Sequence, residues 1–543
     1  MTPAPPAPKL APTHAIGAML AEQASTRPDA RFCHAAGVGY TFAEMHRRAD
    51  EVAAGFAALG VSKGDRVALL IPNRPEMLEL FFGLARLGAV QVPLNAALKG
   101  MFLHHQLAQS EADILVADAA GIASAEPLLE DLAGVRAVVA IDPLDGGEWS
   151  GPELLEYRAV TPSGGVPPEV EIAASDTMSI VYTSGTTGLP KGCVLSHAYY
   201  ARSASRHIEA LEIGAEDSLF TAMPLFHGGG RMVILTSALI VGIPVHFEAR
   251  FTASGYLQRL VETDASIVFA VGAMGIALLA TAPGPLDRAH RVHTAMIAPM
   301  SPVDQQRFQE RFGIEPWVSV FGQTECMPIC LTPKTDQRDN AGCGRPAPDL
   351  EVALLDDDGQ RVADGQIGEI CLRPREPHAM FDGYWKQPQA TVGAFEHLWY
   401  HSGDFGRVLP SGEIGFVDRR KDALRRRGEN VSSLQLEAGI RTHSSIADVA
   451  VHAVPSDLSE DDIKACLVLV AGADLSPADV AAFFQENVPS YALPRYVEVL
   501  EELPVNAVNR VMKHVLRDRG VTEGTWDLQA LGLIASRKRP ISA

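Results

Sequence analysis

The 543-residue chain lacks paired cysteines and any excess of basic residues. Its seven cysteines are scattered without a CxxC pair, which argues against a disulfide framework and predicts a reduced, cytoplasmic protein. The formal net charge is −20, with 46 Lys and Arg against 66 Asp and Glu. Because a nucleic-acid backbone requires a basic surface, no nucleic-acid partner is expected. Any anionic small ligand must be held by local cations and backbone amides.

Long apolar runs are also missing. The most apolar stretch, 267–282, is shorter than the roughly 20 residues that a membrane-spanning helix needs, so no membrane span is expected. A buried strand and helix are predicted there instead. The Pro- and Ala-rich start has no apolar segment of a signal peptide, and we predict a disordered leader over 1–14 and a loose tail over 536–543.

What the chain does contain is an α/β pattern. Two short apolar runs, 66–71 and 89–94, flank a segment with helical spacing of apolar residues at 76–87. Such units build parallel sheets covered by helices, and the alternation recurs to about residue 320. Between 350 and 415, turn clusters separate short apolar runs, which predicts a β-rich subdomain. A basic stretch follows Asp418 and then a new alternation, so we place a domain boundary there.

The strongest local signal is TSGTTGLPKG, which follows an apolar run at 178–182. Its glycines allow a tight turn and a close approach to an anion, its hydroxyls are donors, and its lysine adds positive charge. A strand leading into such a loop is typical of phosphate binding by backbone amides. It is not a Walker loop, because Gly192 follows the lysine. The predicted phosphate-binding residues are Thr183, Ser184, Gly185, Thr186, Thr187, Gly188 and Lys191.

This loop resembles the signature of the ANL superfamily of adenylate-forming enzymes, which includes acyl-CoA ligases, adenylation domains and luciferases. The similarity extends from about residue 15 to 520. Other segments resemble the family's motifs and follow its order: GDRVALLIPN (64–73), PLFHGGG (224–230), FGQTE (321–325), GRPAP (344–348), GYW (383–385), HSGD (401–404), and DRRKD followed by GENVSSLQLE (418–437).

The resemblance implies an α/β enzyme with a large N-terminal domain of parallel and mixed sheets over 15–417, a hinge at 418–421, and a small mobile α+β lid over 422–535. The active site would lie between them. Two half-reactions are implied: a carboxylic acid and Mg·ATP give acyl-AMP and pyrophosphate, and coenzyme A then displaces AMP. The expected cofactors are ATP or acyl-AMP, coenzyme A and Mg²⁺, and the expected partner is a small-molecule carboxylic acid or its adenylate.

The same resemblance gives roles to residues at the nucleotide. Glu325 matches the magnesium-binding carboxylate, and Mg²⁺ can be held by one or two carboxylates together with phosphates. Phe321, where the family has Tyr, would stack on adenine, with Thr324 in the same motif. Asp404 would accept hydrogen bonds from the ribose hydroxyls, and Arg419 would help to hold the ribose.

Further residues match the acyl and thiol side of the family's site. His227 would lie near the acyl carboxylate and the entering thiol, although a structural role is equally compatible with a lone histidine. Lys421 takes the hinge position, and Gly428 would let the pantetheine arm pass close to the backbone. Arg427 stands where a glycine is usual, at the end of the basic run 425–427. That run either faces solvent or holds the phosphates of coenzyme A.

One departure from the family decides the expected activity. The family's catalytic lysine lies in a segment like LPxTxxGK, but residues 503–517 read LPVNAVNRVMKHVLR, and Arg510 occupies the lysine position. The Arg guanidinium is a wide planar group, whereas the Lys ammonium is a compact point charge. The loss of one preorganised charge contact lowers the reaction rate by a factor on the order of 10²–10³. We therefore expect impaired adenylation and spared thioester formation, with acyl-AMP supplied by a separate adenylating enzyme. Lys513 could substitute only if the segment shifts.

The acyl pocket is also unusual. Met296, Ile297 and Ala298 stand where the family commonly has Gly-Gly-Ala, and the segment 269–280 is rich in Gly, Ala and Met. Methionine lets such a wall adapt its shape, which favours an apolar, bulky acid. A polycyclic or terpenoid acid of specialised metabolism, a fatty acid and an aryl acid all stay open. So do a carrier-protein thiol in place of coenzyme A, and the oligomeric state.

Two alternatives to a thioester-forming ligase remain. The intact phosphate loop favours a complete ATP-dependent acyl-CoA synthetase, in which Arg510 serves as the adenylating residue. The other alternative is a non-catalytic protein that binds acyl-adenylate. The matching Lys421 and Gly428 argue against that alternative, because binding alone does not need a loop that faces coenzyme A.

Overall fold

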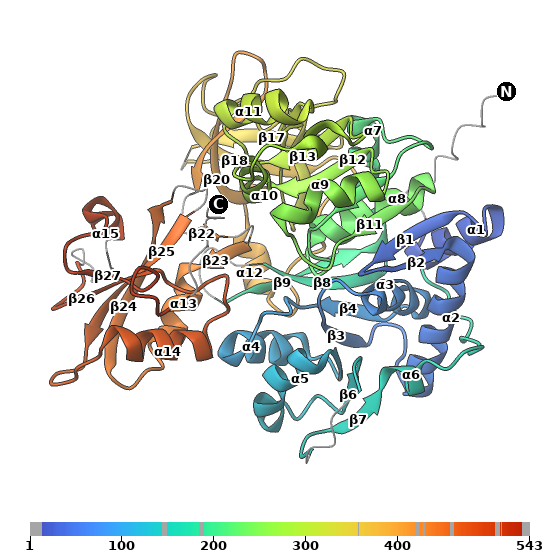
Figure 1. Cartoon of the computed structure of the whole chain (residues 1–543), viewed down its shortest axis with the longest axis horizontal. Helices are drawn as coiled ribbons and strands as arrows, with labels where there is room; N and C mark the ends of the chain where they lie inside the picture. Colours follow the sequence, from blue (N-terminus) through green and yellow to red (C-terminus); the bar gives the residue numbers. More distant parts are fainter. Residues whose placement is uncertain are drawn as a thin grey trace.

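The computed structural model describes residues 14–143, 149–183, 189–356, 358–419, 423–426, 429–456, 461–504, 511 and 513–534. It is an α/β protein with a large N-terminal part and a smaller C-terminal one (Figure 1). This confirms the predicted fold class. The boundary near Asp418 stays a prediction, because residues 420–422 lie outside the described part. None of the described helices has the length and apolarity to cross a membrane.

Two seven-stranded sheets dominate the N-terminal part, and each is parallel apart from one antiparallel pair at its edge. The first sheet runs, in spatial order, β7 (Glu153–Glu156), β6 (Ala137–Ala140), β5 (Ile114–Ala117), β3 (Arg66–Leu70), β4 (Val90–Pro93), β8 (Thr177–Thr183) and β9 (Lys191–Ser196). The second runs β14 (Pro316–Trp317), β13 (Thr294–Ala298), β12 (Ile267–Val271), β10 (Leu219–Thr221), β11 (Val245–Phe247), β1 (Arg31–Ala35) and β2 (Val38–Thr41).

The largest hydrophobic core joins these two sheets through helices that pack between them. Helix α3 shows why the local sequence forms its element: Pro75 at the first turn has a suitable fixed φ, and Gly88 ends the helix with φ 74°. With β3 and β4 it confirms the unit predicted at 66–94. The helices that contribute to this core are α1 (Ile16–Thr26), α2 (Phe42–Ala58), α3 (Pro75–Leu87), α6 (Tyr157–Val160), α7 (His197–Leu211) and α8 (Thr236–Val241).

Further helices cover the outer sides of the sheets. Helix α10 follows β12 directly, which confirms the buried strand and helix predicted at 267–282. These outer helices are α4 (Gly100–Ser110), α5 (Ala119–Ala125), α9 (Ala253–Glu262), α10 (Gly272–Leu279) and α11 (Pro302–Phe312).

A five-stranded antiparallel sheet follows, as the turn clusters between 350 and 415 predicted. Its strands are β17 (Leu350–Leu355), β18 (Gly368–Pro374), β20 (Trp399–Val408), β19 (Phe395–Glu396) and β21 (Ile414–Arg419). The hairpin of β15 (Val320–Gln323) and β16 (Cys326–Leu331) and the short helix α12 (Pro388–Gly393) lie in the same part of the chain.

The C-terminal part is built on a four-stranded sheet and three helices. It contacts the large part through α4: Lys99 donates to the carbonyl of Gln485, and a Cβ on Gly439 would lie 3.2 Å from Met101 Sδ. Its elements are β22 (Ala423–Arg426), β23 (Glu429–Ser432), α13 (Ser433–Ile440), β24 (Ile446–Pro455), β25 (Asp461–Leu469), α14 (Pro477–Asn487), β26 (Tyr496–Leu500), α15 (Lys513–Arg519) and β27 (Thr525–Asp527).

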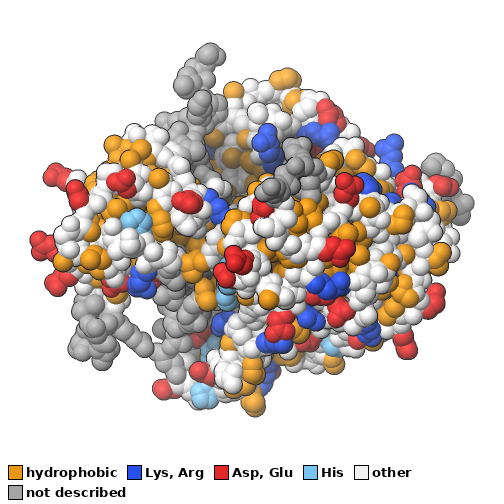
Figure 2. All heavy atoms as spheres, turned by 90° about the horizontal axis from the view of Figure 1, so that it is seen from below, with side chains coloured by type: hydrophobic (Ala, Val, Ile, Leu, Met, Phe, Trp, Pro, Cys, Tyr) orange, Lys and Arg blue, Asp and Glu red, His pale blue; other side chains and the backbone are white. Residues whose placement is uncertain are grey.

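The surface carries both signs of charge. On the face drawn in Figure 2, acidic and basic side chains are interspersed among apolar ones and form no basic stripe. All seven cysteines are free, and six of them are buried.

Candidate active site

The predicted phosphate loop connects β8 and β9, which pair antiparallel. Thr183, the last residue of β8, lies opposite Lys191, the first residue of β9. The Lys191 ammonium lies 4.8 Å from the centre of the Tyr384 ring. The rest of the predicted loop, Ser184, Gly185, Thr186, Thr187 and Gly188, lies outside the described residues.

Glu325 lies in the turn between β15 and β16 and is buried, with 7% of its surface exposed. Its Oε1 accepts hydrogen bonds from the Tyr384 hydroxyl at 2.8 Å and from Thr183 Oγ1 at 3.4 Å. Burial and the adjacent Glu325 carboxylate raise the pKa of Tyr384, so its hydroxyl stays a donor. Among the described residues, no Lys or Arg forms an ion pair with Glu325. A buried carboxylate that has neutral donors and no ion pair among the described residues suits a hard cation such as Mg²⁺.

The fold brings Asp404 next to the motif that contains Phe321 and Gln323, although Gln323 and Asp404 are 81 residues apart in the sequence. Asp404 lies in β20 with 1% of its surface exposed, and its Oδ2 accepts a hydrogen bond of 2.6 Å from Gln323 Nε2. Arg419 is its backbone neighbour on β21, but the Arg419 side chain lies outside the described part. The Thr324 carbonyl accepts a hydrogen bond from the Tyr199 hydroxyl at 3.1 Å.

Phe416 was missed by the sequence reasoning. Its ring is 47% exposed, and its centroid lies 6.2 Å from that of Phe321. A flat base could stack against such faces. Phe416 lies three residues before Arg419 in the same strand, so its place beside a predicted ribose contact was the only signal in the sequence.

His227 belongs to the loop between β10 and a π-helical segment, Gly229–Leu235, and its ring lies 4.7 Å from that of Phe226. Asn73, which the sequence reasoning also missed, anchors this loop. Its Nδ2 donates to the carbonyls of Met223 at 3.0 Å and Glu248 at 2.9 Å, and its Oδ1 accepts from the Leu225 amide at 2.7 Å. A signal was present, because Asn73 follows the carboxyl end of a parallel strand, where ligand sites form.

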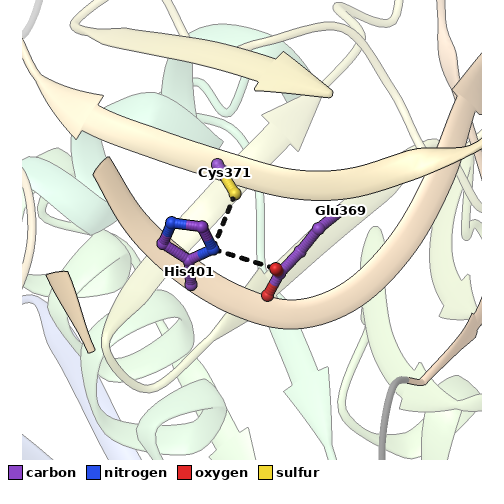
Figure 3. A group of neighbouring side chains, drawn as sticks. All are labelled: Glu369, Cys371 and His401. Atoms are coloured by element: carbon purple, nitrogen blue, oxygen red, sulfur yellow. Dashed lines mark hydrogen bonds and ion pairs between the residues drawn. The ribbon is translucent and has the colours of Figure 1, made fainter. Parts of the chain in front are cut away.

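Three side chains of the five-stranded sheet meet beside Asp404: Glu369 and Cys371 of β18 and His401 of β20 (Figure 3). His401 Nδ1 lies 2.9 Å from Glu369 Oε2 and 3.3 Å from Cys371 Sγ. Glu369 Oε1 accepts a hydrogen bond of 2.9 Å from the Gly403 amide. These groups include metal-ligating types and lie within 4.8 Å of one another.

A hydrogen-bonded brace explains this cluster better than a metal site does. His401 Nδ1 already contacts the Glu369 carboxylate, and its buried Nε2 has no partner among the described residues. A metal-bound histidine almost always donates its other ring N–H to an acceptor. The cluster therefore fixes the backbone at Gly403, one residue before Asp404.

The acyl-pocket residues divide between two faces of β13. Met296 and Ala298 are partly exposed and share one face, whereas Ile297 is fully buried on the other. Ile297 packs against α10, where its Cγ2 would lie 3.0 Å from a Cβ on Gly275. The expectation that all three residues line one wall is therefore corrected: Ile297 lies behind Met296 and Ala298.

In the C-terminal part, the structure describes Lys513 but not Arg510. The Lys513 ammonium lies 2.7 Å from Glu437 Oε1 and donates to Ser433 Oγ at 2.8 Å. Its side chain is 13% exposed. The only lysine near the predicted catalytic position is thus held inside the C-terminal part in this arrangement. Lys421, Arg427, Gly428 and Arg510 lie outside the described residues.

Comparison with known proteins extends these observations. Residues 20–385 match the AMP-binding enzyme family, and residues 435–509 match the AMP-binding enzyme C-terminal domain. A crotonobetaine/carnitine–CoA ligase of Escherichia coli O1:K1 / APEC is 31% identical over 486 residues, which cover 88% of this chain and 93% of that protein.

Two solved structures show the same fold at 25% sequence identity. A double mutant of o-succinylbenzoate CoA synthetase (MenE) from Bacillus subtilis, bound with its product analogue OSB-NCoA, has a TM-score of 0.80 and covers 92% of this chain and 98% of its own. ATP-bound MatB from Rhodopseudomonas palustris has a TM-score of 0.66 and covers 93% and 98%.

Proposed function

The chain belongs to the AMP-binding enzyme family and is an acyl-CoA ligase of the adenylate-forming kind, and we propose that it works mainly in the second half-reaction. In that reaction an acyl group passes from its adenylate to the thiol of coenzyme A, and AMP is released. A separate adenylating enzyme would supply the acyl-AMP. The free, mostly buried cysteines support a cytoplasmic location.

The observation that carries this proposal is Arg510 at the position of the family's adenylating lysine. A guanidinium is a wider, planar group than an ammonium and does not fit a site built for a point charge. Lys513 does not replace the missing lysine in this arrangement, because its ammonium is engaged by Glu437 and Ser433. Adenylation is therefore the weakened step.

The arrangement of the C-terminal part supports the same half-reaction. In Figure 1 the hairpin β22–β23 faces the large part, whereas α15, which follows Arg510, lies at the far end. Gly428, proposed to contact coenzyme A, lies in the sequence between β22 and β23, so this arrangement suits the second half-reaction.

The nucleotide would bind at the ends of β8 and β15 and beside the middle of β20. Thr183, the loop 184–188 and Lys191 would hold phosphate, and Glu325 would hold Mg²⁺ when ATP is bound. When present, Mg²⁺ would neutralise phosphate charge. The adenine would stack on Phe321 next to Thr324. The ribose would bind Asp404 and Arg419.

The proposed acyl site lies around His227, Met296 and Ala298, and the proposed coenzyme A contacts are Lys421, Gly428 and Arg427. An apolar acid fits the partly buried Met296 and the strand β13, which is apolar after Thr294. The crotonobetaine/carnitine–CoA ligase relatives suggest a second class, acids with a quaternary ammonium group. Such a group is usually recognised by aromatic faces, and Phe226 beside His227 offers one.

The substitution Arg510→Lys tests the proposal. With ATP, Mg²⁺ and a suitable acid, ATP–pyrophosphate exchange should be very slow in the wild type and should rise by on the order of 10-fold or more in Arg510→Lys, because the compact ammonium is restored. Asn509→Gly can be added to relax the backbone beside it. Acylation of coenzyme A from supplied acyl-AMP should stay within about twofold in the same variant.

The intact phosphate loop and the buried Glu325 favour one other candidate, a complete ATP-dependent acyl-CoA synthetase. In that case Arg510 is the working residue. Wild-type exchange would then be fast, and Arg510→Lys would not increase it.

A further inference from the structure

We propose that Gln323 is a positioning residue that fixes the Asp404 carboxylate for binding the two ribose hydroxyls of the nucleotide. This inference rests on the proposed function, which places the ribose at Asp404. Gln323 lies at the end of β15, between the residues proposed to bind adenine and the metal ion, and does not itself belong to either group.

The side-chain amide of Gln323 spans the turn that carries Asp404. Its Nε2 donates to Asp404 Oδ2 at 2.6 Å and to the Ser402 carbonyl at 2.8 Å. An amide nitrogen has two hydrogens, so both are used on this turn. Ser402 Oγ in turn accepts from the Asp404 backbone amide at 3.1 Å.

Tyr400 sets the direction of the Gln323 amide. Its hydroxyl donates to Gln323 Oε1 at 3.1 Å, so the oxygen faces Tyr400 and the nitrogen faces Asp404. Burial, together with the nearby Glu325 carboxylate, raises the pKa of Tyr400, which keeps it a donor. Tyr400 also lies beside Tyr384, whose hydroxyl donates to Glu325. A chain of side chains thus connects Asp404 with Glu325.

The turn is held from its other side by Glu369. The Glu369 carboxylate accepts from the Gly403 amide and contacts the His401 ring, which fixes the backbone (Figure 3). Gln323 instead bonds to the side chain of Asp404 and limits its rotation. A ribose diol needs both carboxylate oxygens of Asp404 in a fixed plane. Gln323 holds the carboxylate in that plane before the nucleotide binds, so it should strengthen only the hydrogen bonds to the two ribose hydroxyls.

The test compares the binding of AMP and 2′,3′-dideoxyadenosine 5′-monophosphate to the full chain by calorimetry. The wild type should bind AMP more than about 10-fold more tightly, because the hydroxyls bond to a charged group. In Gln323→Leu this preference should fall about fivefold or more, through weaker AMP binding with little change for the dideoxy compound. Tyr400→Phe should also lower the preference for AMP, by a smaller factor. Tyr400→Phe removes only a hydroxyl, so it tests the inference even if Gln323→Leu folds poorly.

Gln305→Leu is the matched control. Gln305 is buried, whereas Gln323 is half-buried, and Gln305 Nε2 likewise makes two hydrogen bonds, to the Met300 and Asn340 carbonyls at 2.8 and 2.9 Å, away from Asp404. Its replacement should leave the preference for AMP unchanged.

Each outcome decides one point. A wild-type preference that persists in both Gln323→Leu and Tyr400→Phe overturns the role of Gln323 and leaves the proposed function intact. A wild type that does not prefer AMP over its dideoxy analogue removes the ribose from Asp404, and both the nucleotide site and this inference fail.

Discussion

A single asparagine holds the loop that carries His227. Asn73 is 5% exposed and satisfies two carbonyls and one amide of distant segments. Asn73→Ala leaves these buried groups without partners, and each such group costs about 1–3 kcal/mol. We expect the large part to lose about 2–4 kcal/mol of stability, seen as a lower urea midpoint, and the acylation of coenzyme A from acyl-AMP to slow.

Asn487→Ala is the matched control for Asn73. Asn487 Nδ2 donates to one carbonyl, that of Phe483, within its own helix. Its loss should cost under about 1 kcal/mol. Equal effects of the two substitutions would show that Asn73 does not anchor the loop.

At the residue scale, the sequence predicted the place of some side chains well and that of others not at all. The alternation along β13 could have separated Ile297 from Met296, because side chains of a strand point to opposite faces in turn. The contacts of Asn73 and Gln323 could not be foreseen, since their partners lie 150 and 81 residues away. Which side chains meet across such distances depends on how the sheets pack.

At the scale of elements, the C-terminal part depends on the pair of Lys513 in α15 and Glu437 in α13. Glu437 is 3% exposed and also accepts a hydrogen bond of 2.6 Å from the Val451 amide. Lys513→Met keeps the aliphatic stem but leaves this carboxylate without its cation, and the loss of one partner of a buried pair costs about 3–5 kcal/mol. Hydrogen exchange at 433–455 should accelerate accordingly.

Lys386→Met provides the comparison, because the Lys386–Glu111 pair is exposed, at 52% and 47% of the two side chains. Such pairs contribute about 0–1 kcal/mol, and exchange should barely change. If Lys513→Met instead left α13 and β24 stable and reduced ATP–pyrophosphate exchange, Lys513 would be an adenylating residue, and the argument from Arg510 would fail.

Helices and strands could be predicted from the sequence where the local pattern of apolar and polar residues is strong. The unit β3–α3–β4 has clear strand and helix periods and standard ends, so its bounds were predicted closely. Two-residue strands such as β14 and β19 carry no period. The pairing of β1 with β11 joins segments far apart in the chain, which no local signal specifies.

At the scale of the whole molecule, sequence composition and motif order indicated the fold class and the family, but not how the C-terminal part sits on the large one. That position depends on contacts of α4 with α13 and α14, such as Gly439 against Met101 and Lys99 with the Gln485 carbonyl. A rotation that exchanges these contacts would present another face of the C-terminal part to the site. The two half-reactions are expected to use different faces.

The most direct test of the central claim compares two routes to acyl-CoA in one preparation of the wild-type enzyme. One route supplies the acid with ATP, Mg²⁺ and coenzyme A, and the other supplies synthetic acyl-AMP with coenzyme A. If Arg510 impairs adenylation, acyl-CoA should form on the order of 10²-fold faster from acyl-AMP than from ATP. Equal rates from the two routes would contradict the account and identify a complete ATP-dependent ligase.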